Sequence, residues 1–272
     1  MIIIIDALNK HKFGSVLREM HRLRARVFEG RLGWDVKVRD GMERDMYDDL
    51  NPAHVVSLDD GGHVVGCMRL LQTTGPHMLA DVFSSILDGE PPLRSAQLWE
   101  ATRFCVDTKR LTTGKTRNSI SYVTSEVMVG AFEYAMKAGV RDAVAVIDPV
   151  MNRVLTRSGN APYDYVGSAK PMGKVTAMAA LMDCSAERVA SVRAFAGIEG
   201  DVFATEEEAL ARFALSQKPK PVPALSGDGR IARDLEEYFS QQMLSAETPD
   251  EAQAVMRLMS AVTEQLGAVR KP

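Results

Sequence analysis

The amino-acid sequence predicts an α/β protein, specifically an α/β/α sandwich built on a mixed sheet. Two observations favour this class. Some segments carry apolar residues at a helical period, whereas others are short β-branched runs. Along residues 1–217 these segments follow the order helix, antiparallel strands, helix, strand, helix, strand, which is typical of helices layered on a sheet. The composition, with 46% hydrophobic and 25% charged residues, is that of an ordinary globular protein.

The elements are expected in the following order. The Ile-rich start predicts a first strand at residues 1–5, and apolar spacing predicts a helix over 11–28. The remaining predicted elements are a hairpin of strands 54–58 and 63–71, a strand at 98–106, a helix at 118–138 ended by Gly139, a strand at 142–147, a helix from Pro149 to about Arg157, a strand at 174–182, and helices at 185–196 and 206–216. Residues 29–52 hold Trp34, Asp45 and Asp48, which favours a functional loop over a disordered one.

The C-terminal part differs from the rest in composition. Residues 218–230, KPKPVPALSGDGR, are rich in Pro, Gly and Lys and are predicted to be a linker. Beyond them, helical patterns at 231–246 and 249–267 predict a helical hairpin. The predicted organisation is therefore a domain at 1–217, the linker, and a hairpin of unknown role at 231–272.

Composition also limits the possible functions. A net charge of −3 argues against a general nucleic-acid binder. Cys67, Cys105 and Cys184 are odd in number and far apart, as expected for reduced thiols in a cytoplasmic protein. No Cys or His stands in metal-ligand spacing, so no metal is expected. The apolar run at residues 1–5 is too short to span a membrane, and none of the chain is predicted to do so.

Two nucleotide-binding motifs are rejected. Gly114-Lys115-Thr116 lacks the earlier glycine of a phosphate loop, because position 109 is Lys109. The spacing Gly227-x-Gly229-x-x-Ala232 imitates a dinucleotide fingerprint, but a proline-rich segment precedes it instead of a strand.

Charged and aromatic residues in the first hundred positions predict the functional site. They are Arg24, Phe28, Trp34, Asp45, Asp48, Arg69, Phe83, Glu100 and Arg103. If they converge, the charges must pair, because unpaired buried charges are costly. The alternative is an amphipathic N-terminal helix with an ordinary ion-pair face.

In order and spacing, the segments R24-x3-F28, W34, D45-x2-D48, R69, F83 and E100-x2-R103 resemble the signature of the acyl-homoserine-lactone synthases. The resemblance covers about residues 1–200. It implies a fold similar to that of N-acetyltransferases. It also implies a quorum-sensing enzyme that acylates S-adenosylmethionine from an acyl carrier protein or coenzyme A thioester and then lactonises the product. S-adenosylmethionine is then a co-substrate, and no permanently bound cofactor is expected. This ligand fits the residue types: its sulfonium suits an aromatic face and its carboxylate suits an arginine.

The resemblance also implies a role for each site residue. Glu100 is the candidate general base, and Arg103 forms an ion-pair network with Asp45 and Asp48. Arg24 and Arg69 are the other cations of the site, whereas Phe28 and Trp34 wall the adenosylmethionine pocket. Phe83 is either part of this site or a core aromatic. On a regular strand Glu100 and Arg103 point to opposite faces, so either the strand is bulged or the two residues serve different layers.

Two further surfaces are implied. Basic docking residues for an acidic acyl carrier protein are expected at Arg153, Arg157, Lys170 and Lys174; the alternative is a solvated basic helix end. The acyl pocket is expected to be lined by Thr102, Phe104, Ala145, Ile147, Met151 and Leu155. Ala145 occupies the position where family members that favour 3-oxo chains often have threonine, so unsubstituted chains are expected to be preferred.

Two competing functions remain open at this stage. An ordinary acyl-coenzyme A N-acyltransferase of the related fold is disfavoured because residues 110–116 do not supply its glycine-rich pyrophosphate loop cleanly. A non-catalytic binder of adenosylmethionine or acyl ligands is disfavoured because Glu100 is retained beside the whole charged set.

Overall fold

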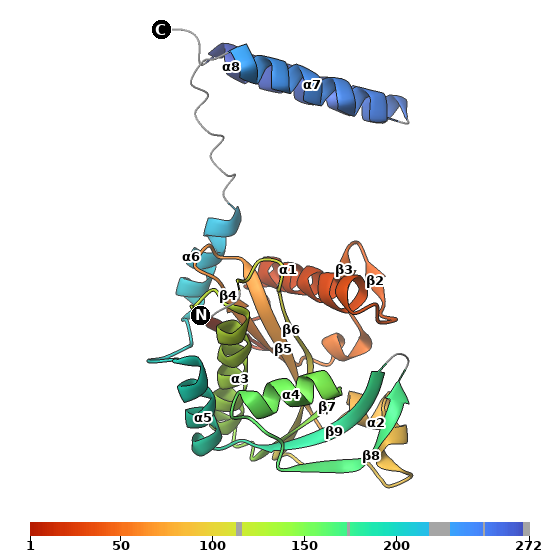
Figure 1. Cartoon of the computed structure of the whole chain (residues 1–272), viewed down its shortest axis with the longest axis vertical. Coiled ribbons are helices and arrows are strands. Elements are labelled where there is room, and N and C mark those ends of the chain that lie inside the picture. Colours follow the sequence, from red (N-terminus) through yellow and green to blue (C-terminus); the bar gives the residue numbers. More distant parts are fainter. Residues whose placement is uncertain (113–115, 173–174, 218–228, 247, 269–272) are drawn as a thin grey trace. The chain divides into compact units, whose positions relative to one another are not determined.

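The computed structural model of the chain describes residues 1–112, 116–172, 175–217, 229–246 and 248–268 (Figure 1). It contains two compact units, Met1–Lys218 and Pro219–Pro272. The predicted linker lies outside the described residues as far as residue 228, as does the rejected phosphate-loop motif at Gly114 and Lys115. The domain boundaries at 217 and 230 stay a prediction.

A seven-stranded mixed sheet forms the centre of the first unit. Its strands, in spatial order, are β1 (Ile2–Ile5), β4 (Ala53–Leu58), β5 (Val64–Gln72), β6 (Leu98–Val106), β7 (Asp142–Ile147), β9 (Val175–Asp183) and β8 (Asp164–Met172). Neighbouring strands are antiparallel except β6 and β7, which are parallel.

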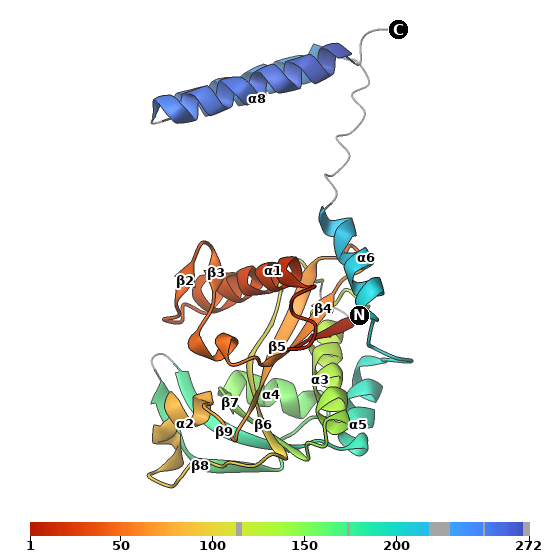
Figure 2. The ribbon, with the colours of Figure 1, turned by 180° about the vertical axis from the view of Figure 1, so that it is seen from behind.

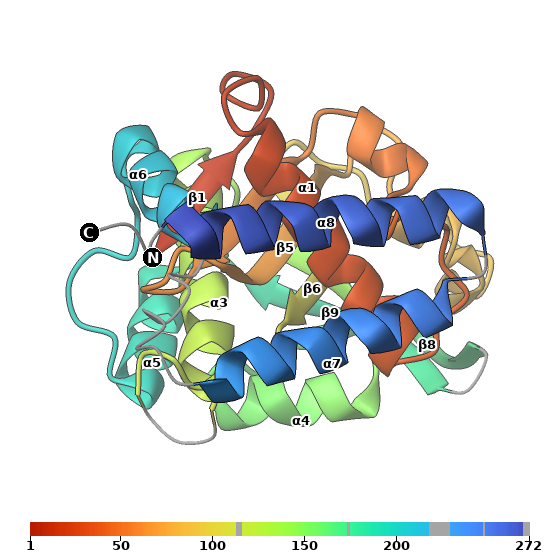
Figure 3. The same ribbon diagram turned by 90° about the horizontal axis from the view of Figure 1, so that it is seen from above.

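Helices cover both faces of this sheet. They are α1 (Gly14–Ala25), the π-helix η1 (Arg26–Arg31), the 3-10 helix η2 (Met46–Asp49), α2 (Met78–Asp81), the 3-10 helix η3 (Ser84–Leu87), α3 (Ile120–Lys137), α4 (Pro149–Arg157), α5 (Ala186–Ala196) and α6 (Glu206–Gln217). One hydrophobic cluster joins α3, α4 and α5 to one face, and others join α1, α6 and α2 to the opposite face. Figure 2 shows the reverse side of the molecule, and Figure 3 shows α1 across the strands from α3, α4 and α5. The predicted α/β/α sandwich with a mixed sheet is confirmed.

Helix starts follow the expected capping chemistry. Asp148 caps α4, because its carboxylate accepts a hydrogen bond of 2.7 Å from the Met151 amide, and Pro149 follows at the first turn. Thr205 and Glu208 form a capping box at the start of α6, because each side chain accepts a bond from the other residue's backbone N–H, and the spacing Thr-x-x-Glu is the sequence signature of such a helix start.

The structure differs from the expected elements in four places. The short helices α2 and η3 lie between β5 and β6, where no element was predicted. The segment predicted as an irregular loop at 29–52 contains a small hairpin, β2 (Val38–Arg39) and β3 (Met42–Glu43), and η2. The first helix changes to a π-helix at Arg26. The strand β8 was not predicted, because its sequence, DYVGSAKPM, contains Gly167 and Pro171 and a single β-branched residue. Gly167 has a φ of 65°, and a Cβ there would lie 1.9 Å from the Ile86 carbonyl oxygen, so the chain needs glycine at this position.

The second unit contains the predicted helical hairpin, α7 (Gly229–Ser245) and α8 (Pro249–Ala268). Phe239 is buried and meets the ring of Tyr238 edge-on, with 5.4 Å between ring centroids. At the start of α8, Thr248 Oγ1 accepts a bond of 3.3 Å from the Glu251 amide. Within the described ranges, no helix is both long enough and apolar enough to cross a membrane.

Candidate active site

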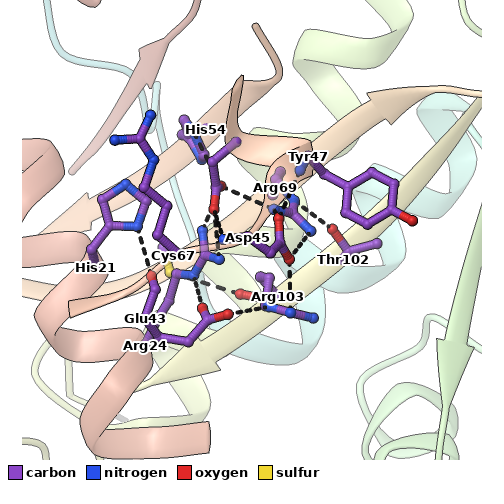
Figure 4. A network of polar contacts seen from close by, with 12 residues as sticks. His21, Arg24, Glu43, Asp45, Tyr47, His54, Cys67, Arg69, Thr102 and Arg103 are labelled. Atoms are coloured by element: carbon purple, nitrogen blue, oxygen red, sulfur yellow. Dashed lines mark hydrogen bonds and ion pairs between the residues drawn. The ribbon is translucent and has the colours of Figure 1, made fainter. Parts of the chain in front are cut away.

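Three arginines and three carboxylates form one network on the α1 side of the sheet (Figure 4). The cations Arg24, Arg69 and Arg103 come from α1, β5 and β6. The carboxylates come from the segment predicted as a functional loop and are Glu43, Asp45 and Asp48. The structure brings together the arginines and aspartates of the network that the resemblance implied, with two differences. Glu43 replaces Glu100 as the third anion, and the ion-pair partners of Arg103 are Glu43 and Asp45, whereas Asp48 pairs with Arg24 and Arg69.

Each cation of the network bridges two carboxylates. Arg24 Nε lies 2.5 Å from Glu43, and its two Nη atoms bind both oxygens of Asp48 at 2.7 and 3.0 Å. Arg69 binds Asp45 through both Nη atoms and Asp48 at 2.9 Å. Arg103 reaches Glu43 at 3.1 Å and Asp45 at 2.8 Å. Paired, bidentate contacts of this kind are what buried guanidinium groups require.

Burial increases from the outer to the inner members of this network. The Arg24 and Arg69 side chains are fully buried, whereas Arg103 is 10% exposed and Asp45 18% exposed. Burial alone would raise the pKa of Asp48, but the charges and hydrogen bonds of Arg24 and Arg69 outweigh it and hold that pKa far below its usual range. Arg24 and Arg69 therefore act as the inner, structural cations, and Arg103 is the one that faces outward.

Glu43 is a site residue that sequence reasoning missed. Its carboxylate is buried and joins Arg24 to Arg103. The available signal was the spacing of Glu43 and Asp45, which places both side chains on one face if the segment is extended. The irregular loop predicted for residues 29–52 has no such alternation, and this is why Glu43 was missed.

Glu100 stands beside the network but is held by the backbone. Its two oxygens accept hydrogen bonds of 2.7 Å from the Met78 amide and 2.6 Å from the Leu79 amide, at the start of α2. The side chain is fully buried. Burial raises the pKa of Glu100 to about 7, although the two backbone N–H groups act in the opposite direction. A carboxyl group with this pKa is suited to proton transfer near neutral pH.

Arg103 lies at a bulge of β6. Its φ is 53°, in the left-handed region, and the pairing of β5 with β6 shifts register between Cys67 and Arg69. The Thr102 hydroxyl accepts a bond of 3.0 Å from Arg69 on the α1 face, and Arg103 contacts carboxylates on the same face. The bulge therefore resolves the geometric conflict between Glu100 and Arg103. Such non-glycine residues at positive φ are uncommon and cluster at functional sites.

An aromatic pair lies against the outward-facing cation. The rings of Phe28 and Trp34 are stacked, with centroids 5.1 Å apart, and the Arg103 guanidinium lies 5.6 Å from the Phe28 centroid. Phe28 is buried, whereas Trp34 is 40% exposed. The arrangement offers an aromatic surface and a cation at one edge of the network.

Comparison with known proteins identifies the chain. The family model described as autoinducer synthase matches residues 9–192. An acyl-homoserine-lactone synthase of Agrobacterium fabrum (strain C58) is 35% identical over 178 residues, which are 65% of this chain and 83% of that protein. One from Rhizobium radiobacter is 39% identical over 165 residues, 61% of this chain and 77% of that protein.

The chain belongs to the autoinducer synthase family. Solved structures agree with this assignment. The synthase LasI has a TM-score of 0.61 at 31% identity, covering 74% of this chain and 98% of that chain. The CoA-dependent synthase BjaI, solved with SAM and isopentyl-CoA, has a TM-score of 0.65 at 25% identity, covering 79% and 99%. The predicted family, fold class and acyltransferase class are confirmed.

The expected acyl-pocket residues of this synthase divide between the two faces of the sheet. Ala145, Ile147 and Leu155 belong to the buried cluster beneath α3, α4 and α5, and Phe104 and Met151 pack against it. Thr102 lies on the other face, where its hydroxyl is bound by Arg69. The Thr102 hydroxyl therefore does not replace the threonine hydroxyl that is missing at Ala145.

The expected docking residues of the synthase are separated in a similar way. Arg153 and Arg157 are exposed on α4. Lys170, on β8, forms an ion pair with Asp88. Lys174 lies outside the described residues. Phe83 is partly buried and packs against two hydrophobic clusters, which favours its interpretation as a core aromatic.

Two histidines lie behind the network. Burial lowers the pKa of His54 to about 3, so the ring is neutral, and its Nδ1 has no hydrogen-bond partner in the described structure. His21 meets it edge-on at 6.2 Å and contacts the Glu43 carbonyl through Nδ1. Neither histidine was singled out from the sequence. Among the residues that the structure describes, no three His, Cys, Asp or Glu side chains form a group that could hold a metal ion.

Proposed function

We propose that this autoinducer synthase makes an acyl-homoserine lactone, a quorum-sensing signal, from S-adenosylmethionine and an acyl thioester. The amine of S-adenosylmethionine attacks the thioester carbonyl, and the thiol leaves as the amide forms. The carboxylate of the acylated intermediate then attacks its own γ-carbon, which closes the lactone ring and expels 5′-methylthioadenosine. The observation that carries this proposal is the Arg–carboxylate network beside Glu100, in a chain of this family.

The first step requires an amine without its extra proton, and Glu100 is the proposed base. A carboxylate has about four lone-pair sites, so two backbone bonds leave acceptor capacity on both oxygens. Because the side chain is fully buried, we assign the transfer to a water that carries the proton from the amine to Glu100. The hydrogen bonds from the Met78 and Leu79 amides hold the Glu100 carboxylate in one position while the proton is transferred.

S-adenosylmethionine is proposed to lie against the aromatic pair. The exposed face of Trp34 suits both the adenine ring and the sulfonium cation. The Nη1 atom of Arg103 contacts only the Met78 sulfur in the described structure, at 3.5 Å, so this cation can bind the carboxylate of the co-substrate. Arg24, Arg69, Asp45 and Asp48 would hold the walls of this site and not touch the ligand.

The acyl chain is proposed to occupy the opposite face of the sheet. The strands β6 and β7 pair from Leu98↔Asp142 to Glu100↔Val144, although the two strands continue to Val106 and Ile147. A thioester placed between these strand ends would present its carbonyl to the amine beside Glu100. Its chain would then extend among Phe104, Ala145, Ile147, Met151 and Leu155.

An acyl carrier protein or coenzyme A is the proposed acyl carrier. Arg153 and Arg157 expose two positive charges one turn apart on α4, which suits an acidic carrier. BjaI and MesI are CoA-dependent synthases, so a coenzyme A thioester is the second candidate donor. We place this activity in residues 1–217 and in the cytoplasm, where the free thiols Cys67, Cys105 and Cys184 stay reduced.

Expression of the full chain in a host that lacks such signals tests the proposal. Mass spectrometry of the medium should detect an acyl-homoserine lactone, which neither an ordinary N-acyltransferase nor a non-catalytic binder would produce. An inactive Glu100→Gln chain expressed to the same level is the control. Medium without lactone, from cells that hold folded protein and both substrates, would contradict the proposed function.

A further inference from the structure

The π-helix η1 carries one half of the proposed aromatic wall. Phe28 is part of η1, and the Trp34 amide donates a bond of 2.9 Å to the Phe28 carbonyl just beyond it. The Leu32 amide bonds to the Val27 carbonyl at 2.9 Å, the five-residue step of a π-helix. Short π-helical segments are rare and are found disproportionately at functional sites. The position of the aromatic pair therefore depends on what holds this segment.

The turn that follows β6 holds η1 at both ends. Arg26, the first residue of η1, binds the Asp107 carboxylate at 3.0 Å. Arg31, the last residue, binds Thr108 Oγ1 at 2.5 Å and the Val106 carbonyl at 3.5 Å. Asp107 is itself fixed, because its other carboxylate oxygen accepts bonds from the Lys109 and Arg110 amides.

The ion pair joins an exposed side chain to a buried one. The Arg26 side chain is 47% exposed and that of Asp107 is 10% exposed, and both residues line an open hollow of about 720 Å³ together with Lys109 and Phe213. Solvent around Arg26 weakens the electrostatic attraction within this pair. The consequence of the contacts with η1 is geometric: β6 carries Glu100 and Arg103, and its terminal turn fixes the segment that carries Phe28. One strand thereby sets both sides of the proposed site.

We propose that Asp107 and Thr108 are positioning residues for S-adenosylmethionine, acting through Arg26 and Arg31 to place the Phe28–Trp34 pair. This inference rests on the proposed function, because it assumes that the pair contacts the co-substrate. Neither residue touches the ligand. Their contribution is to keep the aromatic wall in its binding geometry before the ligand arrives, which lowers the cost of ordering it on binding.

The test compares Arg26→Met and Arg31→Met with a matched control in the full-length chain. The control is Arg22→Met, because Arg22 is 48% exposed and pairs with Glu19 at 2.6 Å on the same helical run without contacting the turn. Calorimetric titration gives the Kd for S-adenosylmethionine, steady-state kinetics separate KM from kcat, and thermal unfolding gives Tm. Arg26→Lys retains the charge and should restore most of the wild-type affinity.

We expect Kd and KM for S-adenosylmethionine to rise about 3- to 10-fold in Arg26→Met and Arg31→Met, with kcat within about twofold of wild type. The Arg22→Met values should equal those of the wild type. Wild-type affinity in both test variants would overturn the inference, and so would a fall in kcat with KM unchanged. If either arginine variant folds poorly, the same Kd and KM are measured for Asp107→Asn. This variant keeps the oxygen that accepts from the Lys109 and Arg110 amides but removes the charge that pairs with Arg26, so the same rise is expected. A wild-type chain that binds no S-adenosylmethionine would instead overturn the proposed function.

Discussion

Glu100 and Arg103, three residues apart on β6, both contact Met78. The Met78 amide donates to Glu100 at 2.7 Å, and the Met78 sulfur accepts a bond from Arg103 at 3.5 Å. This is possible because Arg103 takes a left-handed backbone conformation, which bulges the strand. The proposed base and the outward-facing cation are therefore held around one residue, and changes at either should affect the same site.

The outer ion pair of the network should show energetic coupling. Arg103 Nη2 lies 2.8 Å from Asp45, and Arg103 and Asp45 are the most exposed residues of the network. We expect Asp45→Asn and Arg103→Ala each to impair use of S-adenosylmethionine. In a double-mutant cycle on kcat/KM, their coupling should be about 0.5–3 kcal/mol.

The control for this cycle is the exposed pair of Arg44 and Asp49, which lies in the same segment of chain. Its side chains are 60% and 67% exposed, so Arg44→Ala and Asp49→Asn should combine additively. Strict additivity of Asp45→Asn with Arg103→Ala would show that the two residues do not act as one network.

Removal of the second unit should leave an active enzyme. The first unit holds the sheet, its helices and the whole proposed site, and α6 ends at Gln217. A chain ending after residue 217 should therefore fold and turn over S-adenosylmethionine at close to the full-length rate. The measurements are circular dichroism and release of 5′-methylthioadenosine. An insoluble truncated protein would instead make the hairpin part of the first unit's core.

Ala145 should select against 3-oxo acyl chains. It is buried in an apolar cluster, and the Thr102 hydroxyl lies on the opposite face of the sheet, so neither provides a hydrogen bond to a 3-oxo group there. An unpaired buried polar group costs about 1–3 kcal/mol. In competition between matched donors the unsubstituted chain should be preferred, and Ala145→Thr should move selectivity toward the 3-oxo donor. Ala143→Thr, in the same cluster, serves as a control. Preference of the wild type for the 3-oxo chain would refute this role.

Glu100→Gln should reduce turnover by about two to four orders of magnitude while the fold persists. The amide removes a buried charge, but its single oxygen can accept from only one of the two backbone N–H groups, Met78 or Leu79, so a modest loss of stability is expected. Because burial raises the pKa of Glu100 to about 7, wild-type kcat/KM should increase as pH rises through about 7. Release of 5′-methylthioadenosine and thermal unfolding, both followed from pH 5.5 to 8.5, check the two effects.

The same raised pKa has an opposite consequence for stability. The folded protein binds the Glu100 proton more tightly than the unfolded chain, whose carboxyl has a usual pKa of 4.5. This stabilising contribution is complete below pH 4.5 and is lost as pH rises through about 7. Glu100→Gln should therefore lose less stability than the wild type over this pH range. An unchanged pH dependence of both rate and Tm in the variant would argue against a titrating Glu100.

Much of the fold could be predicted because its elements have strong local signals. The β6 strand was predicted at its observed bounds, and capping by Asp148 and Thr205 marked two helix starts. The β8 strand could not be predicted, because Gly167 and Pro171 weaken its local strand signal. Gly167 is required by the close approach of the Ile86 backbone, and Pro171 is tolerated because β8 lies at the edge of the sheet. Both are tertiary constraints.

The sequence predicted which residues form the site better than it predicted the hydrogen bonds and ion pairs among them. The family resemblance implied that Arg103 would pair with carboxylates and that Arg24 and Arg69 would be further cations of the site. Their actual partners depend on a small hairpin and a bulge that no local pattern specifies. Glu43 was missed for this reason. Contacts such as those of Glu100 with the amides of Met78 and Leu79 join segments about twenty residues apart. The sequence carries no periodic signal for such backbone contacts.

The most direct test of the central claim uses purified full-length protein with S-adenosylmethionine labelled in its methionyl carbons and an acyl thioester on carrier protein or coenzyme A. We expect a labelled acyl-homoserine lactone and 5′-methylthioadenosine in equal amounts, with both products strongly reduced in Glu100→Gln. Acylation of the amine without release of 5′-methylthioadenosine, or no reaction with either donor by folded protein, would contradict it.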